Sequence, residues 1–202
     1  MTRQWGKREE IDLSDNQITA ILQIAEASSK RDYLVIRFMC DCGLRLNEVL
    51  GRLNDDPRKK QTIPGIQVEN VRWDKKTIWL RGKSSRNPYS GRQEQEVPIP
   101  QSLLLPFKDY LGNRDKGRAF DVSDRSIEDH LWKYAREAGL VDWRKVHPHR
   151  LRHYFITRVA RLTKDPVAAR DLARHRSLAV TNRYIAEYDI EQKSSIVERL
   201  SH

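Results

Sequence analysis

The chain has 202 residues, of which 38% are hydrophobic, and its 38 Lys and Arg against 28 Asp and Glu give a formal net charge of +10. This length allows one large domain or two small ones, and this hydrophobic content excludes a wholly disordered chain. The basic excess favours a polyanionic partner, most simply nucleic acid, although a basic surface with no such partner stays open.

The hydropathy pattern excludes membrane insertion and secretion. No segment approaches the roughly 20 apolar residues of a membrane span, and the polar start of the chain lacks the apolar core of a signal peptide. Cys40 and Cys42 lie one residue apart in an apolar run. They are poor disulfide partners there, so we expect buried or half-buried thiols in a reducing compartment. The sequence predicts a soluble cytoplasmic protein.

The amino-terminal part predicts helices. After a polar lead over residues 1–13, residues 14–28 open with a capping box and continue with apolar residues at helical spacing. Residues 33–43 form an apolar run, and residues 44–50 resume helical periodicity. Residues 55–65 have the composition of a loop.

Three short segments rich in β-branched and aromatic residues predict a small antiparallel sheet. They are Ile66–Trp73, Thr77–Arg81 and Gln95–Ile99, with a turn at 74–76 and a polar loop at 82–92. After Pro100 we expect helices over residues 101–111, 124–138, 149–162, 166–174, 177–186 and 190–200. The predicted fold class is therefore α+β, mainly helical, with a small three-stranded antiparallel sheet and no domain linker.

Tyr184 lies in a segment rich in histidine and arginine, nine residues after His175. A phenol is a poor nucleophile near neutral pH, because its ordinary pKa is about 10. Attack on a phosphate therefore needs a neighbouring base and cations that stabilise the developing charge. Arg45 and Arg152 are suited to clamp a phosphodiester, because each guanidinium presents a planar fork of donors.

Histidines gather near Arg152. His149, Arg152 and His153 follow at spacings of three and four, so they share one helix face. A lone histidine is more often a core or cap residue, but the spacing of the whole group favours a site. A zinc hydrolase is disfavoured, because Arg150 follows His149 and the HExxH acid is absent.

Four motifs resemble those of the tyrosine recombinase, or phage integrase, family. The segment Val146–Thr157 resembles its H-x-L-R-H motif, and the interval His175–Tyr184 resembles its second histidine and nucleophile. Gly43–Glu48 is similar to its first arginine box, and Lys83 is similar to its hairpin lysine. The motifs occur in family order over residues 12–188; each alone is weak, but together they are specific.

The resemblance implies DNA cleavage and rejoining through a 3′-phosphotyrosine, with no metal, ATP or other cofactor. The implied catalytic residues are Arg45, Lys83, His149, Arg152, His175 and the nucleophile Tyr184. The two arginines are expected to hold the nonbridging oxygens, His175 to add a hydrogen bond, His149 to transfer a proton at the tyrosine, and Lys83 to protonate the leaving oxygen. Glu48 and His153 are expected to support the site, although a purely structural salt bridge stays open for Glu48.

Contacts with DNA are expected from five arginines, namely Arg81, Arg86, Arg92, Arg150 and Arg174. Arg174 stands where the family usually has a glycine, so its side chain either contacts DNA or faces solvent. Tyr188, four residues after Tyr184, is the reserve candidate for the nucleophile.

The implied function is that of a site-specific recombinase or integrase. Two alternatives stay open, namely DNA relaxation of the type IB topoisomerase kind and a non-catalytic DNA-binding regulator on the same scaffold. The expected partner is double-stranded DNA, with a monomer in solution, a homotetramer on DNA and no membrane. The DNA sequence and the biological task are not predicted.

We expect a catalytic domain over residues 14–188 and a helical tail over 189–202. Family members commonly carry an additional amino-terminal DNA-clamping domain of roughly a hundred residues, so we favour a fragment with weak DNA affinity of its own, while a minimal recombinase that contacts DNA from one side stays open. Apolar residues recur at helical spacing in the tail, at Ile190, Ile196, Val197 and Leu200. The tail either packs on its own domain or docks on a neighbouring protomer.

Overall fold

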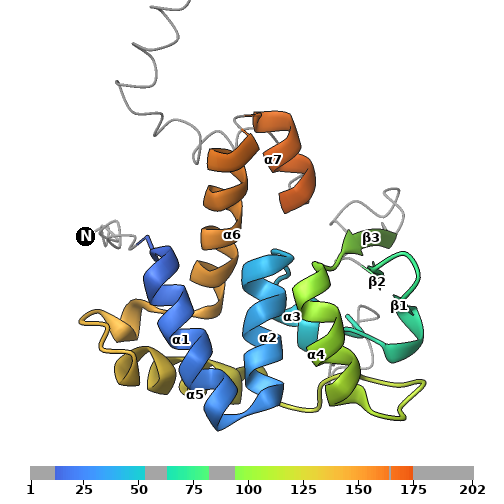
Figure 1. Cartoon of the computed structure of the whole chain (residues 1–202), viewed down its shortest axis with the longest axis horizontal. Helices are drawn as coiled ribbons and strands as arrows, with labels where there is room; N and C mark the ends of the chain where they lie inside the picture. The colour runs from blue at the N-terminus through green and yellow to red at the C-terminus, as the bar shows by residue number, and fades with distance from the viewer. Residues whose placement is uncertain (1–11, 53–62, 82–93, 164, 175–202) are drawn as a thin grey trace, which may run out of the picture. The chain divides into compact units, whose positions relative to one another are not determined.

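The structure is a computed structural model that describes residues 12–52, 63–81, 94–163 and 165–174. The chain divides into two compact units, residues 1–154 and residues 155–202. Seven α-helices, two 3-10 helices and one three-stranded sheet lie within the described ranges (Figure 1). None of these helices is long and apolar enough to cross a membrane.

The first unit contains most of the elements. They are α1 (Asp15–Ser28), α2 (Lys30–Asp41), α3 (Leu46–Leu50), η1 (Val68–Asn70), β1 (Val71–Arg72), β2 (Thr77–Arg81), β3 (Glu94–Pro98), α4 (Gln101–Leu111), α5 (Asp124–Glu137) and η2 (Trp143–Lys145). Helix α6 (Pro148–Thr163) runs from the first unit into the second, and α7 (Pro166–Ala173) belongs to the second. The helices predicted at 14–28, 101–111, 124–138, 149–162 and 166–174 are thus confirmed to within one residue at each end, whereas α2 begins three residues before the predicted run 33–43 and α3 begins two residues after the predicted start at 44.

Side-chain caps set the start of the first two helices. The Ser14 hydroxyl accepts from the Gln17 backbone N–H at 3.3 Å, and the Gln17 side chain accepts from the Ser14 N–H at 2.9 Å. This reciprocal pair is the predicted capping box. Ser29 then ends α1 and caps α2 by accepting from the Asp32 N–H at 3.3 Å. The short connection leaves α1 and α2 antiparallel and side by side (Figure 1).

The sheet is antiparallel in the order β1-β2-β3, with Ile78 opposite both Val71 and Val97. The prediction of a first strand from Ile66 was wrong over residues 66–70. The Val68 N–H donates to the Gly117 carbonyl at 2.9 Å, and the Ile66 carbonyl accepts from Ala119 at 2.9 Å. These backbone groups are hydrogen-bonded to a loop, so they do not pair with β2. The chain then forms η1 before it enters β1.

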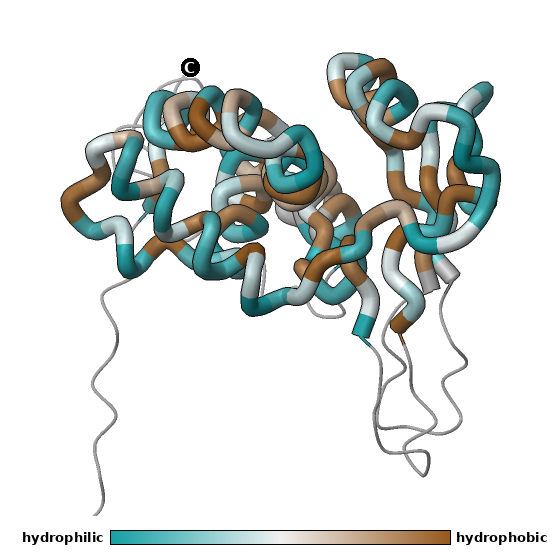
Figure 2. The backbone as a smooth tube through the Cα atoms, turned by 90° about the horizontal axis from the view of Figure 1, so that it is seen from below, coloured by the Kyte–Doolittle hydropathy of each residue, from teal (hydrophilic) through white to brown (hydrophobic). Residues whose placement is uncertain are grey.

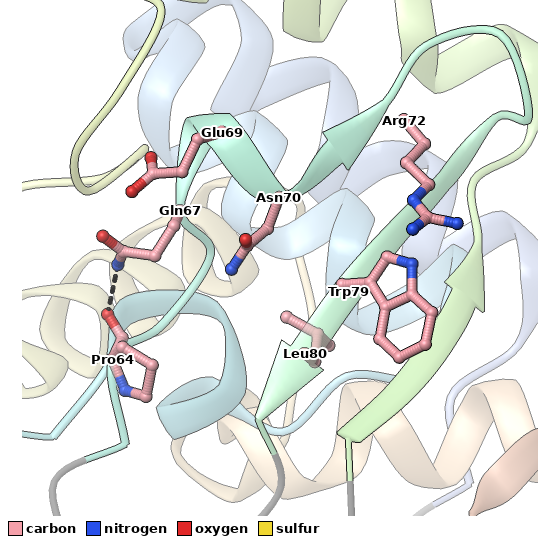
Figure 3. Close-up of a pocket in the computed structure, with 7 residues that line it drawn as sticks. All are labelled: Pro64, Gln67, Glu69, Asn70, Arg72, Trp79 and Leu80. Carbon is pink, nitrogen blue, oxygen red and sulfur yellow. Dashed lines mark hydrogen bonds between the residues drawn. The ribbon is translucent and has the colours of Figure 1, made fainter.

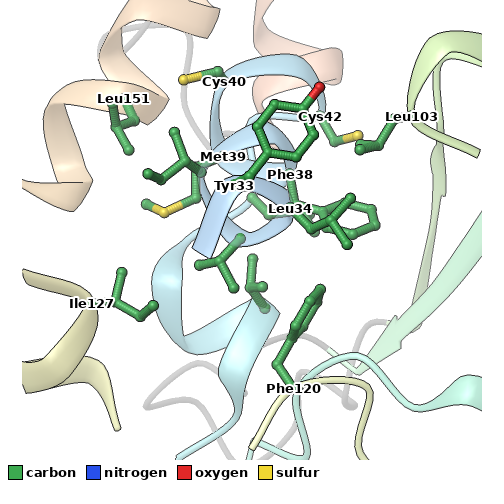
Figure 4. Packing of buried hydrophobic residues seen from close by; sticks show 14 of the residues in the cluster. Tyr33, Leu34, Phe38, Met39, Cys40, Cys42, Leu103, Phe120, Ile127 and Leu151 are labelled. Atoms are coloured by element: carbon green, nitrogen blue, oxygen red, sulfur yellow. The ribbon is translucent and has the colours of Figure 1, made fainter. Parts of the chain in front are cut away.

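Helix α2 lies at the centre of the first unit and contacts α1, α3 and α4. Its residues Leu34, Phe38 and Met39 are at most 1% exposed. The Phe38 ring meets Phe107 of α4 edge-on, with 4.9 Å between ring centroids. Figure 4 shows Leu34, Phe38 and Met39 among the buried side chains of the core, and Figure 2 shows hydrophobic and hydrophilic residues alternating along the helices. Cys40 and Cys42 are buried and form no disulfide with each other, as predicted.

A buried carboxylate joins α2 to α5. Asp32, which is 1% exposed, accepts from the Tyr134 hydroxyl at 2.8 Å and lies 2.7 Å from His130 Nδ1. Arg31 Nε donates to its other oxygen at 2.9 Å. Burial and the hydrogen bond to Asp32 raise the pKa of Tyr134, so this phenol stays protonated and serves as a donor.

The second unit is described over residues 155–163 and 165–174. Asp165 caps α7 by accepting from the Val167 N–H at 2.7 Å. The helix ends at Arg174, whose φ of 54° and ψ of 42° are left-handed. The predicted helices at 177–186 and 190–200 lie outside the described residues, as does the loop at 82–92.

Candidate active site

The turn between α2 and α3 begins with a glycine in the left-handed region. The N–H groups of Cys42 and Leu44 both donate to the Phe38 carbonyl at 3.3 Å, and Gly43 between them has a φ of 62°. A helix commonly ends this way on glycine, because other residues pay a steric penalty at positive φ. The Gly43 carbonyl then accepts a hydrogen bond from Nη1 of Arg152. The end of α2 is thus tied to the start of α6.

Arg45 follows this turn and is held by Glu48. One carboxylate oxygen of Glu48 accepts from the Arg45 backbone N–H at 2.8 Å, and the other accepts from Arg45 Nη1 at 2.8 Å. The Glu48 side chain is 8% exposed, whereas the Arg45 side chain is 51% exposed. A buried acid therefore fixes the backbone and one edge of a guanidinium, and the rest of that guanidinium faces solvent.

Helix α6 supplies two histidines and two arginines in its first turns. Pro148 opens the helix, as its fixed φ favours at this position. Arg152 is only 2% exposed and turns inward to Gly43, while His149 is exposed. Nδ1 of His153 lies 3.5 Å from Asp12. The predicted common face therefore divides into an exposed imidazole and two side chains held by other parts of the first unit.

The charges around His149 show what the turn and α6 bring together. His149 is exposed as a whole residue, but its ring is partly buried. This burial, and then the positive charge on Arg152, His153, Arg150 and Arg45, lower the pKa of His149 from its ordinary value. The histidine is therefore neutral at pH 7 and able to accept a proton. Two arginines that are far apart in sequence act on the same imidazole, and this arrangement is suited to bind an anion and to remove a proton beside it.

Comparison with known proteins identifies the family. A sequence model of the phage integrase family matches residues 12–191 of the chain. The chain belongs to the phage integrase family. The match covers well over half of the sequence and includes all four motifs, so the resemblance predicted from those motifs is confirmed.

Curated relatives of this family member are tyrosine recombinases. The tyrosine recombinase XerA of Pyrococcus furiosus is 26% identical over 179 residues, which cover 85% of this chain and 56% of the relative. The tyrosine recombinase XerC of Escherichia coli O157:H7 is 23% identical over 199 residues, which cover 93% of this chain and 59% of the relative. The chain thus spans less than two thirds of the length of either relative.

Solved structures show the same fold at lower identity. The crystal structure of XerA recombinase has a TM-score of 0.68 at 20% identity and covers 98% of this chain and 67% of that protein. The catalytic domain of bacteriophage HP1 integrase has a TM-score of 0.62 at 19% identity, with 94% and 95% coverage. The Tn1549 transposon integrase in complex with transposon right end DNA has a TM-score of 0.72 at 17% identity, with 98% and 68% coverage. The predicted fold class of this integrase-family chain is confirmed.

Half of the predicted catalytic set lies within the described part of the chain. Arg45, His149 and Arg152 are brought together, with Glu48 in contact with Arg45. The remaining candidates lie outside the described residues, and these are Lys83, Arg86, Arg92, His175, Tyr184 and Tyr188. Their roles stay predictions.

Three of the arginines predicted to contact DNA lie within the described residues. Arg150 is 7% exposed, so the structure does not present this guanidinium to a duplex, and its burial argues against the predicted contact. Arg174 takes the left-handed conformation that ends α7, at the position where the family usually has glycine. A glycine fits that conformation without strain, which is a physical reason for the family's preference. For Arg81, the structure describes the backbone position at the end of β2.

A separate cavity of about 410 Å³ lies between η1 and β2 (Figure 3). Its lining includes Gln67, Arg72 and Trp79, with the Arg72 guanidinium carbon 4.9 Å from the centroid of the Trp79 ring. Gln67 donates to the Pro64 carbonyl at 2.7 Å, at the edge of the same cavity. None of the described catalytic candidates lines this cavity, so it is separate from the candidate active site.

The sequence interpretation missed the part that Gly43 takes in the site. Its carbonyl holds Arg152, although the two residues are 109 positions apart. The available signal was a glycine directly after a helical apolar run, which indicates a left-handed helix end. That signal predicts the turn, but no local pattern predicts which side chain its carbonyl meets.

Proposed function

We propose that this chain is the catalytic domain of a site-specific DNA recombinase, which cleaves and rejoins DNA through a 3′-phosphotyrosine on Tyr184. The observation that carries the proposal is the hydrogen bond from Arg152 to Gly43, which ties the start of α6, with the neutral His149, to the turn that holds Arg45. Phosphoryl transfer to a phenol needs cations for the phosphate and an acceptor for the phenol proton, and these three residues are of the required types.

In the proposed reaction, the Tyr184 oxygen attacks the scissile phosphorus while its proton passes to His149. The bond from phosphorus to the 5′ oxygen breaks, and Lys83 supplies the proton that this leaving oxygen takes up. A 5′-hydroxyl of another strand reverses the step, so the phosphodiester energy is kept without ATP. Arg45 and Arg152 hold the nonbridging oxygens, where the negative charge of the transition state gathers, and His175 adds a hydrogen bond.

The state of Arg45 supports this role. Glu48 occupies one edge of its guanidinium, and half of the side chain remains exposed. A planar group that is fixed on one side can present its remaining N–H donors to a phosphate without first being ordered. We therefore assign Glu48 the role of orienting Arg45, in addition to its contribution to the turn.

The test is capture of the covalent intermediate on nicked duplex DNA of randomised sequence. A nick beside the scissile phosphate lets the released fragment diffuse away, so the adduct accumulates. We expect the wild-type chain and Tyr188→Phe to form a denaturant-resistant adduct, and Tyr184→Phe to form none. Sequencing the trapped DNA also gives the target site.

Each other result has a definite meaning. An adduct that survives in Tyr184→Phe and is lost in Tyr188→Phe moves the nucleophile to Tyr188. No adduct with any variant, despite DNA binding, indicates a non-catalytic regulator. Relaxation of supercoiled DNA that lacks the recovered target site indicates activity of the topoisomerase kind.

We also propose that the chain acts inside the cell on double-stranded DNA, as a monomer in solution and a tetramer on its site. The basic net charge of +10 supports the first part. The tail after Asp189, which lies outside the described residues, is proposed to link neighbouring protomers. Mass measurement of the chain on DNA, with and without the tail, tests this, and unchanged assembly after truncation contradicts it.

A further inference from the structure

A half-buried tryptophan shortly before α6 is flanked by two arginines. The Arg144 guanidinium carbon lies 4.7 Å from the centroid of the Trp143 ring, and that of Arg136 lies 5.8 Å from it. Trp143 is half-buried and packs against the core of the first unit, whereas both arginines are exposed. We refer to these three residues as the Trp143 cradle. Stacking on an anchored indole restricts the guanidinium planes and leaves their N–H edges at the rim.

The cradle differs from the other stacked arginines of the described chain. Those arginines also bond a carboxylate or backbone carbonyls, and they are Arg37 with Asp41, Arg72 with Glu96, Arg125 with Asp129, and Arg114 with three carbonyls. Across the described ranges, the structure gives neither Arg136 nor Arg144 a carboxylate or carbonyl partner. Their donors are therefore available to a ligand, and a planar guanidinium prefers paired anionic oxygens.

The position of the cradle points to the same ligand as the candidate active site. Five residue steps separate Arg144 from His149, so their Cα atoms are at most about 18 Å apart even in a fully extended chain. The two guanidinium carbons are each within 5.8 Å of one ring centroid, which limits how far apart they lie. Duplex DNA carries a phosphate about every 3.4 Å along each strand, so a single backbone segment can meet both groups.

We propose that the Trp143 cradle binds DNA phosphates that flank the scissile one, and this proposal rests on DNA being the substrate as proposed above. Arg136 and Arg144 each contact a phosphate, and Trp143 holds both guanidiniums in place. Such contacts position the duplex over His149 and carry no sequence information. An acidic protein is the other possible ligand, but the nearby His149 site and the net charge of +10 favour DNA.

The experiment measures the affinity of the full chain for a short duplex between about 50 and 200 mM NaCl. Each phosphate contact adds about 0.9 to the slope of log affinity against log salt. We expect Arg136→Gln and Arg144→Gln to lower the slope by about 0.9 each, and the double variant to bind about tenfold more weakly near 0.1 M salt. The matched control is Lys30→Gln, which removes one exposed positive charge at the end of α2 opposite to Gly43 and should leave the slope unchanged.

A variant of Trp143 separates the effect of the ring from the effect of the arginine charges. Trp143→Leu keeps both arginines but removes the ring, so we expect about threefold weaker binding with the slope retained. Trp143→Phe should recover most of the loss. If the double arginine variant binds DNA with the wild-type slope, or Lys30→Gln changes the slope equally, the cradle is not a phosphate site.

The covalent adduct distinguishes this failure from failure of the proposed function. An adduct on Tyr184 together with unchanged DNA binding in the double variant overturns the cradle and leaves the recombinase assignment in place. A wild-type chain that binds no duplex overturns both. Retention of the wild type on immobilised polyglutamate, lost in the double variant while DNA affinity is unchanged, assigns the arginines to an acidic protein instead.

Discussion

The two ends of α2 gather similar residue types in different surroundings. At the amino-terminal end, the buried Asp32 is surrounded by Arg31, His130 and Tyr134, all within 2.9 Å. Here a single carboxylate gathers donors, and the cluster joins α2 to α5. The charge is matched within the protein, as a buried carboxylate requires.

At the carboxy-terminal end, several cationic side chains of the described residues lie around one neutral histidine. Arg45 pairs with Glu48, but His149, Arg150, Arg152 and His153 gather near the same place. Partial burial of the ring and this positive charge lower the pKa of His149, and such an arrangement is suited to bind an anion. The same types of side chain thus join two helices at one end of α2 and surround a candidate phosphate site at the other.

The largest expected effect comes from removing the charge of Asp32. Asp32→Asn leaves the cluster without its anion, and breaking a buried pair of this kind costs about 3–5 kcal/mol of unfolding free energy. Urea denaturation measures it. The control is Asp129→Asn, which removes an exposed pair with Arg125 and should cost no more than about 1 kcal/mol. Equal losses in the two variants contradict the structural role of the Asp32 cluster.

The next effect is on chemistry. Arg45→Lys keeps the positive charge but loses the planar fork, so we expect cleavage of the recovered target site to slow by about 10²-fold. Stability should change little, because the side chain is 51% exposed. Arg31→Lys, at the other end of α2, is the matched control and should leave cleavage within about twofold. A similar loss of rate in both variants shows that the two ends do not differ in function.

Local sequence patterns predicted the contacts at the carboxy-terminal end of α2 better than those at its amino-terminal end. The contact between Arg45 and Glu48 follows from a spacing of three residues on a helix, and Ser14 and Gln17 form their capping box for a similar reason. The Asp32 cluster has no such signal, because His130 and Tyr134 are 98 and 102 positions away. A contact of that range depends on how α5 packs against α2, which periodicity alone does not determine.

The prediction of the first strand was wrong for a related reason. Ile66 and Val68 have the alternation of a strand, but their backbone groups pair with Gly117 and Ala119 of a loop. Side-chain pattern predicts that a segment is half-buried, and it does not predict which backbone will pair with it. Residues 66–70 therefore lie beside the sheet and not in it.

A smaller effect is expected at Gly43. Gly43→Ala places a side chain at a φ of 62° and should cost about 1 kcal/mol in stability. It also shifts the carbonyl that holds Arg152, so cleavage should slow. The control is Gly139→Ala, because Gly139 has a φ of 76° at the end of α5 and open space around its Cβ position. Both variants should lose similar stability in urea, and only Gly43→Ala should lose cleavage activity.

The smallest effect concerns protonation of His149. Its pKa in the folded chain lies below the ordinary value near 6.5, so between these two values the unfolded chain binds more protons than the folded one. Stability from this group is therefore present above pH 6.5 and is lost as pH falls through the folded pKa. Urea unfolding of wild type and His149→Gln at pH 7.5 and below should show the larger acid loss in the wild type.

The same shift sets the acid limit of the reaction. Only neutral His149 can accept the tyrosine proton, so the profile of kcat/KM against pH should fall on the acid side with a midpoint below 6.5. Arg45→Gln removes one of the positive charges that depress this pKa, and it should move the midpoint upward while lowering the maximal rate. Arg31→Gln, whose charge is matched by Asp32, should leave the midpoint in place. A midpoint above 6.5 in the wild type contradicts the neutral histidine, because partial burial and neighbouring positive charge both lower the pKa of a histidine.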